Sequence, residues 1–575
     1  MTKSFIEQPE LNALRIISGS FGEESNKQKI DLLKQLSAKA FKSVRMMLKY
    51  QEILLFLSTH PDSKEMFLLA ESELLRLNLH SKQIMKSGNE TKKYALSGSG
   101  LYSTYFLGCF SHAMNSWLLK TFFNCTSFNS FGDSDFTPQE LLGLSLLPVE
   151  SWLLENLHMP EKKWRHHAGG MKSRNSLAWI LESMEQADLP VSLKDILYDS
   201  LKLYISFDIK DQLNASSLLR TPKGKIYFHT EPLIKKFSIE EILKNNIGNP
   251  LTISINDILE YIRVSRFALL HLSRETDTVT YVEPEGLEVF DLDRGLSIAF
   301  FYLPPQRRNA LDAYVGYMVY KNRIPCAYGG AWIFGNKAKI GLNIFSSFRG
   351  GESAYIFSQI IRTYKKRFQL RYFEAEPYQI GKDNPEGILS GAFWFYYKLG
   401  FRPHQVELRS LADNEFTIIS SDKKYKTPAS TLKKLANSMM FLDTKNPGSQ
   451  MKEDLPDSLR ISGQISQFIA EKFQGDRTSA MEYFTREVKK KSGISKVFFK
   501  THYERVMFET LLPLLYFLCV KKSINKKETK QLISLVRAKA SSTELIYTQQ
   551  TRDIQIWIVN SMKNLPSFAD SVLLK

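Results

Sequence analysis

A glycine-containing loop directly before a helix is the first feature of the sequence that could do chemistry. Arg349, Gly350 and Gly351 follow the strand-like run AKIGLNIF, and a segment with helical character begins near Ser353. Glycine lets the backbone approach a ligand closely, and the free amides at a helix N-terminus bind phosphate. The spacing predicts a site for a phosphate-bearing ligand, although a glycine pair before a helix is by itself a weak indicator.

Two carboxylates in the run FEAEPYQIG could take part in proton transfer. Glu374 and Glu376 are two residues apart on a predicted strand, so their side chains share one face. Either could remove a proton from an amine, directly or through water. The alternative is that they pair with Arg371 or Arg402. Pro377 cannot donate a hydrogen bond to a neighbouring strand, which suits an interrupted sheet edge.

Strand-like runs separated by turn residues begin at Thr278, where the helical period of the preceding chain ends. They include TVTYV, LSIAFFYL, YVGYMVY and AKIGLNIF. With the loop, the helix after it and the run NPEGILSGAFWFYYKLGF, residues 295–409 resemble the core of a GCN5-related N-acetyltransferase (GNAT) domain. The resemblance covers about a fifth of the chain.

The loop partly departs from the family pattern Arg/Gln-x-x-Gly-x-Gly/Ala. Arg349 and Ala354 match its first and last positions, but Glu352 stands where glycine is usual. A carboxylate there repels phosphate unless it turns away or binds Arg349, and it could instead stabilise the first helical turn. We expect Glu352→Gly to leave coenzyme A binding equal or tighter. The resemblance implies that acetyl-CoA or another acyl-CoA binds to Arg349, Gly350, Gly351, Ser353 and Ala354.

The resemblance also implies roles in acyl transfer from a thioester. Ala392, Phe395, Tyr396, Lys398, Gly400 and Phe401 fill the family pattern A-x-x-FY-x-K-x-GF. By this match, Tyr396 protonates the departing thiolate, and a phenol with a pKa of about 10 is a reasonable acid for that step. Tyr397 is the fallback. The alternative is that Tyr396 is one more aromatic residue in a packed helix.

In the family, two neighbouring parallel strands splay apart and the pantetheine arm lies in the gap. The strands here would be AKIGLNIF and FEAEPYQIG. Backbone amides around Ile344 and Phe345 would stabilise the oxyanion if a β-bulge is present. Asn343 is a candidate for binding the substrate. GNAT domains usually place two helices between their first two strands, whereas here only residues 304–312 connect them. We therefore expect another part of the chain, such as the N-terminal domain, to form the wall of the acceptor site.

The pattern along the chain predicts an α+β multidomain protein. We expect a mainly α-helical domain over residues 1–277, a GNAT-like mixed sheet with helices on both faces over 278–412, and a basic α-helical domain over 413–575. In the N-terminal half, KGKIYFHT (223–230) is the one clear strand candidate, and the apolar segment 101–123 predicts a buried helix.

Charge and cysteine content bear on the partners and the location. The net charge is +17, and the segment from Ser421 to the end holds 27 basic against 15 acidic residues. This basic third suits an anionic partner such as RNA or an acidic protein, with a solvated basic face as the alternative. The four cysteines are widely separated and lack the spacing of a zinc site. We therefore expect that no metal is bound, that the thiols are free and that the protein is cytoplasmic. No apolar run is long enough for a transmembrane segment.

Three hypotheses follow for the function. The first is an acyl-CoA-dependent N-acyltransferase that acts on a small-molecule or protein amine. The second is a GNAT-like domain with another acyl donor, such as aminoacyl-tRNA in the manner of the Fem-type transferases. The third is a non-catalytic interaction protein in which the helical flanks form a scaffold.

Overall fold

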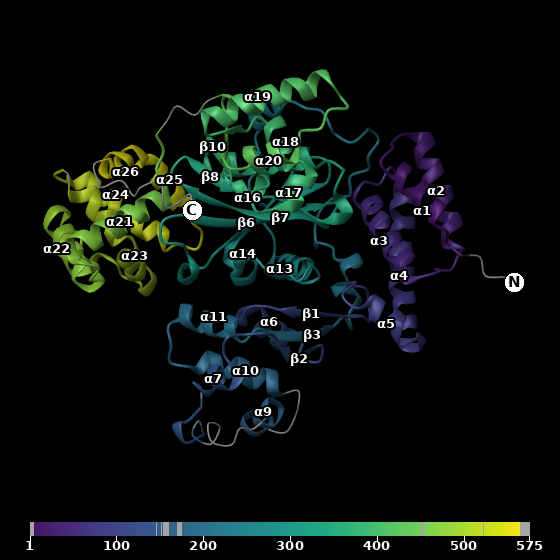
Figure 1. Cartoon of the computed structure of the whole chain (residues 1–575), viewed down its shortest axis with the longest axis horizontal. Coiled ribbons are helices and arrows are strands. Elements are labelled where there is room, and N and C mark those ends of the chain that lie inside the picture. The colour runs from purple at the N-terminus through teal and green to yellow at the C-terminus, as the bar shows by residue number, and fades with distance from the viewer. Residues whose placement is uncertain are drawn as a thin grey trace.

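The protein has an α+β fold arranged around one large sheet (Figure 1). The computed structural model describes residues 5–144, 146–150, 152, 160–169, 175–449, 454–520 and 522–563. The helices of residues 8–96 lie at one end of the large sheet, and those of residues 458–562 lie at the other. A smaller three-stranded sheet with its own helices lies beyond one face.

The large sheet has the strand order β11-β12-β10-β8-β7-β6-β5-β4, and β9 pairs with β7 beside this path. Neighbouring strands are antiparallel except β8 and β10, which run parallel. The strands are β4 (Leu287–Asp291), β5 (Leu296–Tyr302), β6 (Ala313–Lys321), β7 (Ile324–Phe334), β8 (Lys337–Ile340), β9 (Asn343–Ile344), β10 (Tyr372–Ala375), β11 (Arg402–Pro403) and β12 (Met440–Asp443).

The parallel strands β8 and β10 pair over only three residues. Their last paired residues are Lys339 and Glu374. The chain then passes through Gly341, and β9 continues beside β7 without a partnership with β10. The pairing of the two parallel strands therefore ends at this point, where β10 gives way to α16 (Pro377–Ile380).

Alternate residues of each strand face opposite layers. Helix α15 (Ser353–Phe368) contributes to one hydrophobic core, which also contains N-terminal and C-terminal helices. Helices α13 (Ile255–Leu270) and α14 (Asp277–Tyr281) contribute to the other core with the smaller sheet. The first core contains side chains from all three segments predicted as domains, so these segments share buried surface.

The helices around the two cores carry strong local start signals. Ser43, Ser63 and Ser254 each accept a hydrogen bond from a backbone amide in the first turn of the following helix. The N-terminal helices are α1 (Gln8–Ser18), α2 (Glu23–Ser37), α3 (Val44–Thr59), α4 (Lys64–Ser87), α5 (Glu90–Leu96), α6 (His112–Thr121), α7 (Pro138–Gly143), α9 (Glu161–Gly169), α10 (Asn175–Gln186), α11 (Val191–Ser200) and α12 (Ile239–Lys244).

The later helices cover the sheet and form the C-terminal bundle. Pro513 lies within helix α23, and the apolar residues of this helix are buried. Within the described residues, no helix is both long and apolar enough to cross a membrane. These helices are α16 (Pro377–Ile380), α17 (Pro385–Ser390), α18 (Ala392–Lys398), α19 (Val406–Ser421), α20 (Ala429–Leu435), α21 (Ser458–Phe473), α22 (Arg477–Ser492), α23 (His502–Val520), α24 (Lys526–Lys539), α25 (Leu545–Asp553) and α26 (Gln555–Met562).

The N-terminal segment is less purely helical than predicted. Strands β1 (Tyr105–Cys109), β2 (Thr126–Phe131) and β3 (Leu203–Asp208) form an antiparallel sheet in the order β1-β3-β2. The predicted helix over 101–123 is therefore a strand followed by α6. The alternating burial of β1 shows why: only one face of this short strand packs on the core.

Two predicted strands are also wrong. Residues 223–230 are extended without a strand partner, because the backbone amides of Tyr227 and His229 donate to Asn322 Oδ1 and the Pro61 carbonyl instead. TVTYV forms the single helical turn α14, in which Thr278, Val279 and Thr280 are buried. Packing against the sheet outweighs the preference of this β-branched run for strands.

Candidate active site

The predicted phosphate loop lies between β9 and α15. It consists of a 3₁₀ turn, Ser346–Phe348, followed by Arg349, Gly350 and Gly351. Gly350 has a φ of +82°, and a Cβ atom there would meet nothing within 4 Å. No side chain caps the N-terminus of α15. The first backbone amides of α15 are therefore left without side-chain acceptors, at the end of the helix that attracts anions.

Glu352 turns away from this loop into the protein interior. Its carboxylate accepts hydrogen bonds from Arg294 at 2.8 Å, from Lys321 at 3.1 Å and from the backbone amide of Ile234 at 3.0 Å. Burial opposes ionisation, but Lys321 and these other groups hold the pKa of Glu352 below its usual value. The unusual carboxylate is therefore neutralised inside the protein and is not bound to Arg349, which was one of the sequence-based possibilities.

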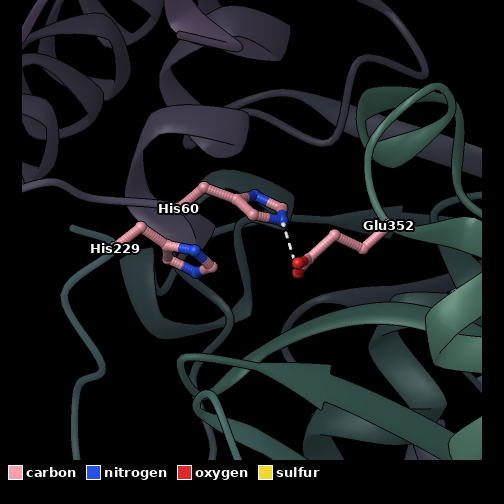
Figure 2. A group of neighbouring side chains, drawn as sticks. All are labelled: His60, His229 and Glu352. Atoms are coloured by element: carbon pink, nitrogen blue, oxygen red, sulfur yellow. Dashed lines mark ion pairs between the residues drawn. The ribbon is translucent and has the colours of Figure 1, made fainter. Parts of the chain in front are cut away.

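Two histidines lie beside this carboxylate (Figure 2). His60, which ends α3, has its Nε2 atom 3.8 Å from Glu352 Oε2, and the ring of His229 lies beside that of His60, with their centroids 5.1 Å apart. Burial and the charge of Lys321 lower the pKa of His60 to about 3 and also lower that of His229. Both rings are thus held neutral.

The three side chains are close enough to hold a metal, but the charge around them does not fit a cation. Arg294 and Lys321 already occupy the two carboxylate oxygens of Glu352. A metal ion would meet both of these positive charges. The side chains of His60, His229 and Glu352 instead connect the end of α3, the extended segment near residue 229 and the start of α15.

The side chain of Arg349 lies at the surface and faces helix α17. Its guanidinium donates to Glu386 on α17 at 2.7 Å and to the Ile344 carbonyl at 3.3 Å. Both side chains of the Arg349–Glu386 pair are more than half exposed, so the pair contributes little stability. Arg349 can therefore exchange this partner for an anionic ligand at small cost.

Tyr396 lies in a packed aromatic environment. It is buried between Phe357 and Phe401, and burial raises its pKa. Its hydroxyl is near that of Tyr317, whose pKa is raised by burial and also by Tyr396. Tyr317 donates a hydrogen bond to the Gly341 carbonyl at 2.7 Å. Tyr396 is therefore a neutral, protonated phenol among packed aromatic side chains, close to Tyr317.

The fallback residue, Tyr397, has a different environment. Its hydroxyl donates to Asp413 on α19, and its ring stacks under the guanidinium of Arg402. Burial first, and then Asp413, raise its pKa to about 12. These contacts indicate a packing role for Tyr397.

The two predicted carboxylate bases differ in their surroundings. Glu374 is buried, with Lys337 at 3.2 Å and His404 at 3.6 Å. Burial would raise its pKa, but His404 and Lys337 hold it below the usual value. Glu376 is exposed and lies 3.9 Å from Lys339. Glu374 thus belongs to a buried ion pair, whereas Glu376 has only a long contact with Lys339 and is accessible from solvent.

The predicted oxyanion donors are only partly available. The amide of Phe345 donates to the Cys326 carbonyl at 3.0 Å and belongs to the pairing with β7. Ile344 and Asn343 form β9 and are half-buried, with Asn343 opposite Tyr328. Between Ile340 and Asn343 the register against β7 does not change, because Ala331 lies opposite Ile340 and Tyr328 opposite Asn343. No extra residue is inserted there, so the described residues lack the β-bulge that the oxyanion prediction requires.

Sequence reasoning missed Gln379. This residue lies on α16, and a Cβ atom at position 341 would come within 3.1 Å of its Nε2 atom. Its side-chain amide therefore covers the backbone where the pairing of β8 and β10 ends. No signal in the run FEAEPYQIG distinguishes this glutamine, because its position depends on the turn that follows β10.

The short connection at residues 304–312 contacts both the N-terminal and the C-terminal segments of the chain. Arg307 forms an ion pair with Asp195 on α11. Arg308 is buried and donates to the carbonyls of Lys539 and Ser542. Residues from α11 and the C-terminal bundle therefore lie where the family resemblance leads one to expect two extra helices.

No protein-family model, curated protein or solved structure matches the chain.

Proposed function

We propose that the protein is an N-acyltransferase of the GNAT type that uses an acyl-CoA donor and an amine acceptor. The single observation that carries this proposal is that the pairing of β8 and β10 ends after Lys339 and Glu374, from where the chain leads through β9 to the loop at Gly350; the proposed gap lies at this point. The thioester arm would lie in this gap, and the diphosphate would rest on the loop and the uncapped start of α15.

The proposed reaction is direct transfer. The neutral amine attacks the thioester carbonyl, the tetrahedral oxyanion collapses, and the C–S bond breaks. Tyr396 donates its proton to the departing thiolate, and the amine loses a proton to Glu376 or to a water molecule that Glu376 contacts. Glu376 is favoured over Glu374 because Glu374 is buried with Lys337.

In this proposal, a local movement at Gly341 opens the space that the donor enters. Gln379 covers Gly341, and its long polar side chain is half-buried. Rotation of this side chain exposes the backbone at Gly341 without a change in the sheet. The Arg349–Glu386 pair, which spans from the loop to α17, opens at small cost because it is exposed.

Acetyl-CoA binding and turnover by the full chain test the proposal. A ligand at 100 times its dissociation constant stabilises the folded protein by about 2.7 kcal/mol, which a thermal shift detects. Tyr396→Phe should lower turnover by about 10²-fold or more while leaving acetyl-CoA binding unchanged. Tyr397→Phe is the matched control and should retain turnover. Loss of activity in the control alone would transfer the role to Tyr397.

A further inference from the structure

A cationic cavity adjoins the phosphate loop on its N-terminal side. Its volume is about 220 Å³, and its walls come from α1, α3, the segment near residue 235 and the loop itself. Its charged lining residues are Arg15, Lys49, Glu52, Lys235 and Arg349. Four positive charges therefore face one negative charge.

Some other cations of the N-terminal segment already have an anionic partner. Lys29, Lys39 and Arg76 each form an ion pair with a carboxylate. In the part of the chain that the structure describes, the side chains of Arg15 and Lys235 have no ion pair. Lys49 donates only to the neutral Gln8, at 2.8 Å.

Unpaired cations from separate segments repel one another when they gather around one cavity. An anion removes this repulsion and accepts charge-assisted hydrogen bonds from several of them. The cavity also includes Gly350, so an anion there would lie beside the diphosphate proposed for the loop.

We propose that this cavity binds a phosphomonoester group of the donor, the 3′-phosphate of coenzyme A, through Arg15 and Lys235. The inference rests on the proposed function and extends it to residues outside the GNAT-like segment. Lys49 contributes positive charge from α3. The N-terminal helices are then part of the donor site, and the protein discriminates coenzyme A from its analogue without the 3′-phosphate.

The test compares coenzyme A with 3′-dephospho-coenzyme A by isothermal titration calorimetry on the full chain. The two ligands differ only in the phosphomonoester. The intact protein should bind coenzyme A about 10- to 100-fold more tightly, as one or two charge-assisted hydrogen bonds imply. In Arg15→Gln and Lys235→Gln, this ratio should fall toward one, while affinity for the dephospho form stays the same.

Lys236→Gln is the matched control, because Lys236 is the exposed neighbour of Lys235 and does not line the cavity. Its ratio should equal that of the intact protein. Arg15 and Lys235 are themselves exposed, so their substitution should leave the folded state intact. Circular dichroism of each variant checks this directly.

The outcomes separate this inference from the proposed function. Equal affinity for both ligands in the intact protein, with acyl transfer present, overturns the phosphate inference alone. If coenzyme A does not bind and no transfer occurs, the proposed function fails. Adenosine 3′,5′-bisphosphate then tests the cavity: binding that depends on Arg15 and Lys235 upholds an anion site, and absence of binding overturns it.

Discussion

Removal of the Glu352 charge should destabilise the whole protein, although the residue belongs to a loop predicted to bind a ligand. In Glu352→Gln, Lys321 and Arg294 lose their shared counter-charge. The Lys321 side chain is 1% exposed and the Arg294 side chain 11% exposed, so water cannot replace the carboxylate. Breaking a buried pair by removing one partner costs about 3–5 kcal/mol. We expect a loss of this size in the free energy of unfolding.

Urea unfolding, followed by circular dichroism, measures this loss. The matched control is Glu386→Gln, which removes the partner of Arg349 from an exposed pair. This change should alter stability by only about 0–1 kcal/mol. A second variant, Glu352→Gln with Lys321→Met, should recover part of the lost stability because it removes a buried unpaired cation.

The same structure corrects an expectation from the sequence. Glu352→Gly should not tighten coenzyme A binding, because the carboxylate points away from the loop and its loss leaves Lys321 and Arg294 unpaired. Unfolding of Glu352→Gln and Glu386→Gln at the same urea concentration would contradict this prediction. That result would mean that Glu352 is not the counter-charge of the two buried cations.

Two further predictions concern the gap and the buried histidines. Gln379→Ala should lower the KM for acetyl-CoA and leave kcat nearly unchanged, because it uncovers Gly341; a raised KM would instead make Gln379 a donor-binding residue. The pKa of His60 is lowered from 6.5 to about 3, chiefly by burial, so between these pH values the unfolded chain binds a proton that the folded protein does not. Stability should therefore fall on acidification below about pH 6.5, with His60 contributing about 1.4 kcal/mol per pH unit. His60→Gln should make this dependence shallower; an unchanged slope would contradict a neutral buried His60.

The parts of the site that depend on nearby residues could be predicted from the sequence. The glycine loop and the start of α15 each follow from short runs with strong local preferences. The role of Glu352 could not be predicted, since Arg294 and Lys321 approach it from 58 and 31 positions away along the chain. The ion pair of Glu374 could not be predicted either, because its partner Lys337 belongs to the neighbouring strand.

The two wrongly predicted strands have a related cause. Residues 223–230 have the composition of a strand, but Asn322 and the Pro61 carbonyl take the hydrogen bonds that a strand partner would make. Thr278, Val279 and Thr280 favour a strand by their branched side chains, yet the surface beneath them accommodates a helical turn. In both places, a distant segment decides the local structure.

The two main departures from the GNAT pattern are both compensated by residues of the flanks. Glu352 is neutralised in a cluster that includes His60 at the end of α3, and the short connection at 304–312 is held by Asp195 and by carbonyls of the C-terminal bundle. Neither departure would be tolerated in an isolated central segment, because each leaves charged groups that need partners when buried. The flanks and the central segment therefore form one structural unit, and a donor site that uses Arg15 and Lys235 would extend the same interdependence to function.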